Sequence, residues 1–279
     1  MKRLLLSALF CLLASVAATA QKATFDPTHF SRQAGALQLG LTPACYDSYL
    51  SPNNFSGLGL GFATESWSQS RLSDNLFVQQ TDVLMADVAM HGAATEFGGY
   101  DRYTCSFAFS LAQRGHFRFF LGPQVQARLG AIYNVQNSNN PVAVHLAANV
   151  GAMAIVEFNA HTLLFHLPIR AFAQADVPLI GTFFAPEYTQ SYYEIFSLHH
   201  WDHLFHLATP VTYFTRSSNI GCDFTLRHSI LRLQFSSEVC QWHTATNNSC
   251  LVHSTVGIGF VRNLYSVHPH EEVVRSLPY

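Results

Sequence analysis

Four histidines within eight residues, in the stretch HHWDHLFH from His199 to His206, form the densest group of possible metal ligands in the chain. On a helix, His199 and His203 would share one face with His206 following, which is an acceptable arrangement for zinc. A zinc-protease helix of the H-E-x-x-H type requires glutamate where His200 stands. We interpret the cluster as structural or adventitious, with a zinc site as the alternative, and predict no cofactor.

Two hydroxyl–histidine pairs have the spacing used by lipid-hydrolysing barrels, in which both side chains reach one face of a strand. They are Ser197 with His199 and Thr255 with His253. Neither pair has a third residue suited to orient the ring, and a chain with 15 histidines produces such patterns by chance. We predict no catalytic residues.

The amino-acid composition indicates that part of the protein surface does not face water. The chain is 49% apolar and 11% charged, whereas an ordinary soluble domain has about 25% charged residues. Its net charge of −2 gives no footprint for nucleic acid. After the N-terminal region, no apolar run approaches the ~18 residues that a spanning helix requires. Part of the apolar surface must therefore face something else.

The N-terminal region has the pattern of a secretory signal peptide over residues 1–20. Two basic residues precede an apolar run from Leu4 to Ala18, and Ala20 supplies a small residue at the cleavage site. We expect export, and an N-terminal periplasmic segment over 21–34.

The cysteines give no complete disulfide framework, because five remain after the expected cleavage. Cys240 and Cys250 flank a polar loop. They are either a disulfide or two separate thiols.

From Gly35 onward the apolar residues alternate with period two, which is typical of strands. In RYTCSFAFSLA, for example, Tyr103, Phe107 and Leu111 fall on one face and small polar residues on the other. In later segments the second face carries charges. In hydrocarbon, strands of this kind are stable only as a closed barrel, so the apolar row would face lipid and the charged row the lumen.

The residues that we expect to line the lumen are charged or ionisable members of these second rows. They are Arg118, Arg128, His145, Glu157, Arg170, Asp223, Arg227, Arg232, Glu238 and His253. Unpaired charges are costly in a narrow interior. A salt-bridged plug is the structural interpretation, and a polar pore or small-solute site is the functional one.

We predict an all-β fold, a closed antiparallel transmembrane barrel of about twelve strands over 35–265, with a tail over 266–279. The expected strands are 35–42, 56–66, 79–91, 102–112, 117–133, 142–158, 162–175, 191–199, 203–213, 219–227, 230–240 and 250–262. With the N-terminus in the periplasm, this count places the histidine cluster in a periplasmic turn, with His206 entering the next strand.

Three blocks carry a family resemblance: GPQVQARLGAIYNVQNSNNPV (122–142), PEYTQSYYEIFSL (186–198) and GFVRNLYSV (259–267). They resemble an uncharacterised group of exported Bacteroidota proteins, a domain of unknown function thought to form outer-membrane barrels. The resemblance covers most of the mature chain and implies residence in the cell envelope. It brings no catalytic residues. The chain departs from the group after Leu198 and beyond Val267.

Together these features predict an integral outer-membrane barrel without enzymatic chemistry. Its role would be that of a narrow or plugged channel, a small-solute binder or an envelope scaffold. Its expected partners are outer-membrane lipid and, during insertion, the barrel-assembly machinery. The alternatives are an outer-membrane hydrolase of lipid or lipopolysaccharide and a soluble periplasmic ligand-binding barrel.

Overall fold

The computed structural model describes residues 30–265 except 71, 74, 139, 165–166, 188–189 and 227–228. The expected signal peptide over 1–20 and tail over 266–279 lie outside the described residues. The elements are β1 (Phe30–Asp47), β2 (Phe55–Gln69), β3 (Leu76–His91), β4 (Ala94–Arg114), β5 (Phe117–Asn134), β6 (Val142–Leu164), β7 (Leu167–Phe184), α2 (Tyr192–Phe196), β8 (Phe205–Ala208), β9 (Tyr213–Thr225), β10 (Ile230–His243) and β11 (Asn248–Tyr265).

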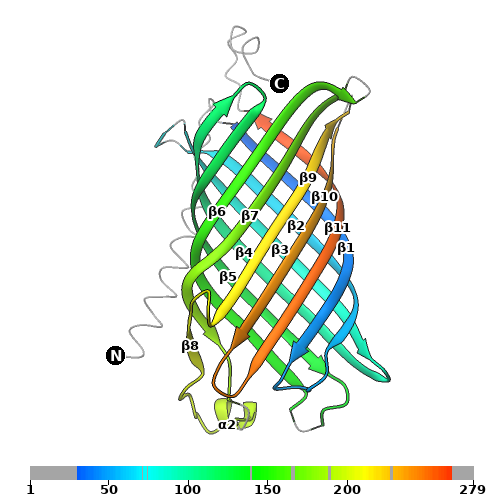
Figure 1. Cartoon of the computed structure of the whole chain (residues 1–279), viewed down its shortest axis with the longest axis vertical. Coiled ribbons are helices and arrows are strands. Elements are labelled where there is room, and N and C mark those ends of the chain that lie inside the picture. The colour runs from blue at the N-terminus through cyan, green and yellow to red at the C-terminus, as the bar shows by residue number, and fades with distance from the viewer. Residues whose placement is uncertain are drawn as a thin grey trace. The chain divides into compact units, whose positions relative to one another are not determined.

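Ten of the strands close into one antiparallel barrel (Figure 1). Each strand pairs with its neighbour along the chain, β1 pairs with β11, and β7 pairs with both β6 and β9. The short β8 adds to the far part of β7 and lies outside the closed set. The predicted closed antiparallel barrel is therefore confirmed, with ten strands in place of about twelve.

The strand register gives the stagger of the barrel. Starting at Ser218 on β9, we step from each residue to its register partner on the next strand. The path through β10, β11, β1, β2 and β3 arrives at Phe97 on β4. Followed the other way, through β7, β6 and β5, it reaches Phe109. The difference, 109 minus 97, is a shear of twelve residues, which requires the strands to tilt by roughly 40°.

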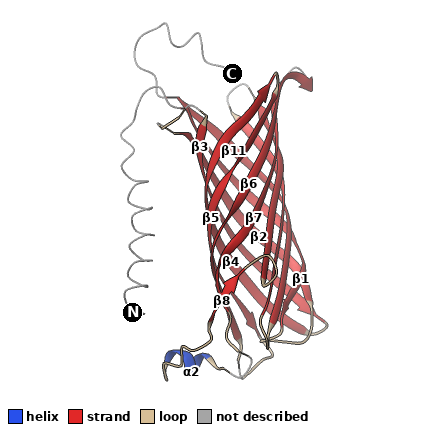
Figure 2. Cartoon of the chain, turned by 60° about the vertical axis from the view of Figure 1, so that its left-hand side comes forward, coloured by secondary structure: helices blue, strands red, loops and turns tan. Residues whose placement is uncertain are grey.

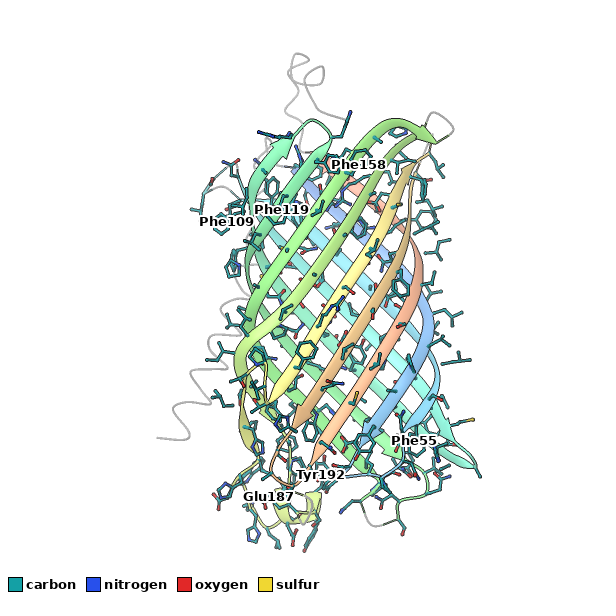
Figure 3. The ribbon with its side chains drawn as sticks, viewed as in Figure 1. Phe55, Phe109, Phe119, Phe158, Glu187 and Tyr192 are labelled. Atoms are coloured by element: carbon teal, nitrogen blue, oxygen red, sulfur yellow. The ribbon has the colours of Figure 1, made fainter. Side chains whose placement is uncertain are left out.

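Burial alternates along each strand, as the period of two predicts. On β5, Arg128 is 4% exposed whereas its neighbour Leu129 is 58% exposed. In a closed barrel the buried row faces the lumen, so the outward row holds leucine, phenylalanine and valine (Figure 3). An apolar outer wall around a charged interior is the arrangement of a barrel that crosses a membrane.

The expected strand at 191–199 is wrong, because this segment begins with the helix α2. Ser191 is its N-cap, and Ser191 and Glu194 form a reciprocal capping box. Ile195 is fully buried with Leu204 and Phe184. The capping signature S-x-x-E outweighs a weak alternation here.

The expected strand at 203–213 is also wrong, since only β8 and the first residue of β9 fall inside it. Two fewer crossings leave the barrel with ten strands. The long connection over 185–212 therefore lies at the end of the barrel away from the start of β1 and the end of β11 (Figure 1). We name this the loop end, and the opposite end the terminal end. The histidine cluster belongs to the loop end.

Both cysteines flanking the polar loop are free. Cys240 is opposite Leu251 in the register, and Cys250 is opposite Gln241. Cys240 is buried in the interior, whereas Cys250 lies on the outward row. Of the two interpretations left open by the sequence, the structure has separate thiols. Among the described residues, no helix is long and apolar enough to cross a membrane.

We predict that Gly122→Ala destabilises the barrel by at least ~2 kcal/mol. A Cβ atom at this position would overlap the carbonyl oxygen of Phe107 on the neighbouring strand. Gly35→Ala is the matched control, because its Cβ atom would lie 3.5 Å from the Phe62 ring, an ordinary contact. Urea unfolding in micelles measures both, and equal stabilities would contradict the prediction.

Candidate functional site: the charged interior

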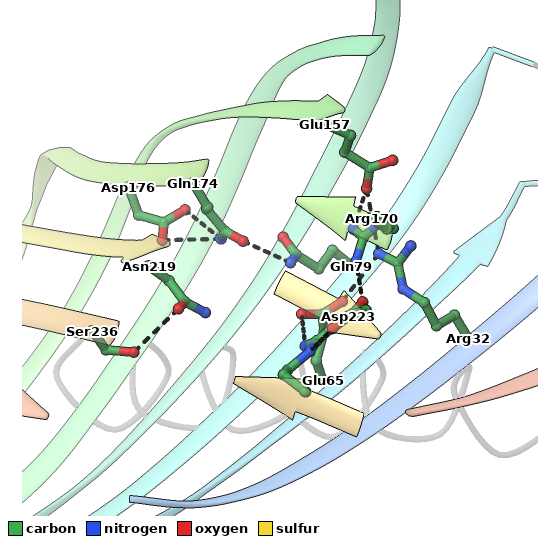
Figure 4. A network of polar contacts seen from close by, with 11 residues as sticks. Arg32, Glu65, Gln79, Glu157, Arg170, Gln174, Asp176, Asn219, Asp223 and Ser236 are labelled. Carbon is green, nitrogen blue, oxygen red and sulfur yellow. Dashed lines mark hydrogen bonds and ion pairs between the residues drawn. The ribbon is translucent and has the colours of Figure 1, made fainter. Parts of the chain in front are cut away.

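Three arginines and three carboxylates alternate in a closed ring inside the barrel, near the terminal end. They come from β1, β2, β10, β9, β7 and β6, so the ring spans the lumen (Figure 4). In order around the ring they are Arg32, Glu65, Arg232, Asp223, Arg170 and Glu157. With three positive and three negative groups, the ring is electrically neutral.

Arg232 is the most extensively bonded member. Its Nε donates to Asp223 Oδ1 at 2.7 Å, and its Nη2 donates to Asp223 Oδ2 at 3.0 Å. Its Nη1 donates to Glu65 Oε2 at 2.9 Å. The guanidinium also lies 4.8 Å from the ring centroid of Phe172. A guanidinium that is 1% exposed is therefore satisfied by two carboxylates and an aromatic face.

The remaining contacts close the ring. Arg170 Nη1 donates to Asp223 Oδ2 at 2.7 Å, and Arg170 Nη2 donates to Glu157. Arg32 Nη2 lies 3.5 Å from Glu157 Oε1 and 3.2 Å from Glu65 Oε1. Ion pairs thus connect all six side chains across the lumen near the terminal end.

A second charged group lies nearer the middle of the barrel. Glu238 pairs with Arg128 and with Arg102, whose Nε atom is 3.3 Å from Glu238 Oε2. The Tyr100 hydroxyl donates to the same carboxylate at 3.1 Å, and the Arg128 guanidinium lies 3.8 Å from the Tyr100 ring centroid. His253 packs edge-on against Tyr100, and neither of its ring nitrogens has a hydrogen-bond partner within the described structure.

Between the two charged groups lies a cavity of about 60 Å³. Its lining includes Asp176, Arg102, Glu238 and His253. Gln174 and Ser217 both donate hydrogen bonds to Asp176. A cavity of this size holds a few water molecules and is too small for a sugar or a lipid.

The loop end is closed by apolar packing. Phe55, Phe183, Tyr213 and Trp242 belong to one buried cluster inside the barrel. The loops above it are tied together, because Asn247 Nδ2 donates to the Pro186 carbonyl at 2.6 Å.

Tyr49 adds another tie between loops. Its hydroxyl donates to the carbonyl oxygen of Gln190 at 2.8 Å. Burial raises the pKa of Tyr49 to about 12, so the hydroxyl keeps the proton that it donates.

The structure places most of the sequence-predicted lumen residues on the inward rows. Arg128, Glu157, Arg170, Asp223, Arg232 and Glu238 take part in the two charged groups described above. His253 borders the cavity. Arg118 lies at the terminal end of β5 and is half-buried, and Arg227 lies outside the described residues.

His145 occupies a separate position near the loop end. Its Nε2 atom lies 3.0 Å from Asp47 Oδ2, and its Nδ1 atom accepts a hydrogen bond from Trp242 Nε1 at 3.4 Å. The side chain is 7% exposed and lies beneath the closing loops. This Asp–His pair is buried, and His145 borders a second, smaller cavity.

The sequence-based set missed Arg32, Glu65 and Arg102, which complete the two charged groups. Arg32 precedes the first expected strand, and Arg102 stands at the start of an expected strand that is in fact much longer. Glu65 was within an expected strand, on the row opposite Leu60 and Phe62. Parity with those exposed residues was the signal that could have identified it.

The histidine cluster does not converge on a metal site. His199 and His203 adopt left-handed backbone conformations with φ of 59° and 60°, and both side chains are exposed. His206 Nε2 lies 3.0 Å from the Ala185 carbonyl oxygen. In the part of the chain that the structure describes, no group of three histidine, cysteine or acidic side chains could hold a metal ion.

We predict that Ser191→Ala raises the pKa of Glu194 part of the way to its ordinary value, because the substitution removes the hydroxyl and keeps the backbone N–H, which makes the larger contribution. The backbone and hydroxyl groups of Ser191 hydrogen-bond the Glu194 carboxylate at 2.8 and 3.1 Å and hold its pKa below that value. The stabilisation is present at neutral pH and is lost as the pH falls through this lowered pKa. Titration of the side-chain ¹³C resonance measures the change. Ser191→Thr retains the hydroxyl as the control, and an unchanged pKa in the alanine variant would refute the cap.

We predict that Arg232→Met costs roughly 3 to 5 kcal/mol, because it leaves Asp223 and Glu65 buried with too little positive charge. Arg118→Met, at a half-buried position, is expected to cost less than ~1 kcal/mol. Adding Asp223→Asn to Arg232→Met should recover part of the loss. Denaturant unfolding checks all three variants. Similar losses for the two arginine variants would count against the ring.

Comparisons with known proteins agree with this architecture and assign no activity. A search of curated proteins finds no match. The translocator domain of the autotransporter NalP from Neisseria meningitidis is 9% identical with a TM-score of 0.36, covering 91% of this chain and 95% of that one. The outer membrane protease OmpT from Escherichia coli is 5% identical with a TM-score of 0.46, covering 88% and 99%. Likenesses this low carry no argument about function.

A family model described as "Protein of unknown function (DUF3316)" matches residues 4–271. The wall and interior described above are those of an outer-membrane type of barrel. Since the match spans nearly the whole sequence, the chain belongs to the DUF3316 family.

Proposed function

We propose that this protein is a sealed outer-membrane barrel that acts as an envelope scaffold and conducts no solute. The observation that carries the proposal is the neutral ring of six charges across the lumen near the terminal end. A pore needs a continuous wet path, and a pore that selects ions by charged side chains needs an excess of one sign. Here the charges cancel within the ring, and every carboxylate in it bonds two guanidinium groups.

The apolar cluster at the loop end supports the same proposal. A solute that passed the ring would still meet Phe55, Phe183 and Trp242, which are 1% to 6% exposed and packed together. The cavity between the two closures has room for water only. The interior therefore stabilises the barrel, and the surfaces carry the activity of the scaffold.

The orientation follows from the connections. Outer-membrane barrels have short periplasmic turns and longer outer loops. The longest connection, 185–212, is at the loop end, so we place that end outside the cell and the terminal end in the periplasm. Lipid contacts the apolar wall, and the barrel-assembly machinery is the expected partner during insertion. A Bacteroidota source stays an expectation from the family resemblance.

The two alternative functions fit the geometry less well. Thr255 and His253 point into the barrel, where both are 5% exposed or less, so lipid in the surrounding membrane does not reach them. Ser197 follows a short helix in an outer loop. A soluble periplasmic barrel would expose its leucine and phenylalanine rows to water, at a cost of about 25 cal/mol per Å² of apolar surface.

We predict that the refolded protein carries no ionic current across a planar lipid bilayer, because the ring and the loop-end cluster close the lumen in series. Heat-modifiable gel mobility confirms that the sample is folded, and a general porin in the same bilayers is the positive control. Stepwise currents from the folded fraction would overturn the sealed barrel and favour a channel.

A further inference from the structure

Three charged side chains interrupt the apolar outer wall of the barrel. Away from the strand ends, the outward rows of the described strands carry Asp82 on β3, Asp101 on β4 and Arg216 on β9. All three are exposed. Their neighbours on the wall are apolar, since Leu84 is opposite Asp101 and is 59% exposed, and Phe214 is two residues from Arg216.

Such charges are expensive when they face lipid. An arginine or lysine near the middle of the bilayer costs roughly 2 to 4 kcal/mol on the lipid face of a barrel. The Asp82 and Asp101 carboxyls lie within hydrogen-bonding reach of each other. The ion pairs found among the described residues include neither of them, nor Arg216. Ionisable groups in this position mark functional surfaces by default.

The acidic pair and Arg216 lie at matching depth in the barrel. Because the strands are tilted, register partners on neighbouring strands do not lie at equal depth along the barrel axis. With a shear of twelve over ten strands, the residue at equal depth is displaced from the register partner by 12/10, or 1.2 residues, per strand. We traced the register partners of Arg216 to β4 and corrected each step by this shift. The route over six strands and the route over four strands in the other direction both place the depth of Arg216 at about Arg102 on β4. On β3 the same depth falls at about Leu84. Asp101 and Asp82 lie within two residues of that level, or roughly 5 Å along the barrel axis.

The two sites also lie on nearly opposite sides of the barrel. Between the β3–β4 pair and β9, the strands are β5, β6 and β7 on one side and β10, β11, β1 and β2 on the other. One copy can therefore present its acidic pair to one neighbour and its arginine to another. Copies inserted by the same route share one orientation, so equal depth is the condition for such contacts.

The wall beside Arg216 is shaped for close approach. Ala154, Ala175 and Ser218 lie side by side in the register of β6, β7 and β9 and present small side chains. The wall around the acidic pair carries the large side chains Leu84 and Leu129, and beside them a row of small residues, Ala86, Gly99 and Ala131, in the register of β3, β4 and β5. Small residues at an interface allow the backbones of helices to approach closely in membranes, and the same physics applies to two barrel walls that each carry a row of small residues.

We infer that a second copy of this chain is the partner of this surface, with Arg216 of one barrel bonded to Asp82 and Asp101 of the next. The contact joins two different faces, so it is heterologous and extends into rows in the plane of the membrane. A hydrogen bond between the two carboxyl groups requires one of them to carry the proton, so the pair holds a single negative charge, which the guanidinium neutralises. A planar guanidinium suits two neighbouring carboxyl groups.

The test measures association of the full chain by sedimentation equilibrium in density-matched micelles. Wild type is expected to form oligomers, and Arg216→Gln alone, or Asp82→Asn with Asp101→Asn, is expected to weaken association by at least about tenfold. The first variant lacks the arginine of one contact face, and the second lacks the acidic pair of the other. When mixed, they are expected to form dimers, because one contributes the intact acidic pair and the other the intact arginine.

Arg262→Gln is the matched control, because it removes an exposed arginine at the terminal end of β11, outside the apolar wall. Gel mobility before and after heating verifies that each variant is folded. A monomeric wild type, unchanged association in the variants, or a mixture without dimers would each overturn the inference. Unchanged association would assign Arg216 to lipid phosphate instead.

Discussion

Backbone pairing in hydrocarbon governs the rest of this structure. Where no water is present, each N–H and C=O group of a strand must find a partner in the chain. The pairing of β1 with β11 provides this for the two strands that would otherwise be edges. Once the sheet closes, alternate side chains along each strand face either the lipid or the lumen. Closure and alternation together are therefore enough to separate the apolar rows from the charged rows.

Closure also explains why the interior charges pair over long distances in sequence. Glu65 and Arg232 are 167 positions apart, yet the barrel brings their side chains within 2.9 Å. Burial of either alone would be costly, whereas the alternating ring leaves no excess charge. Near the middle of the barrel, two arginines share Glu238, and hydrogen bonds from Gln174 and Ser217 stabilise Asp176. These contacts stabilise the barrel by joining strands that are distant in sequence.

The sequence predicts the membrane-crossing strands well where alternation is strong, as in β5, whose bounds differ by one residue from those expected. It fails where other physics decides. The first eight residues of β4 include Gly98, Gly99 and an outward Asp101, which hide the alternation. At 191–199 a capping box and a buried isoleucine produce α2. The ring could be predicted only in part, because a pattern along one strand does not identify a partner on another.

The interior and the wall follow opposite electrostatic rules. Inside the barrel, each charge of the ring is paired within the same chain, so the ring needs no other molecule to neutralise it. On the wall, the carboxyl pair on β3 and β4 has no cation within this chain's described ion pairs, and the arginine on β9 has no anion. A chain that neutralises the ring inside and leaves charges on its lipid face is completed from outside. The matched depth of these wall charges makes another barrel of the same kind the partner that fits.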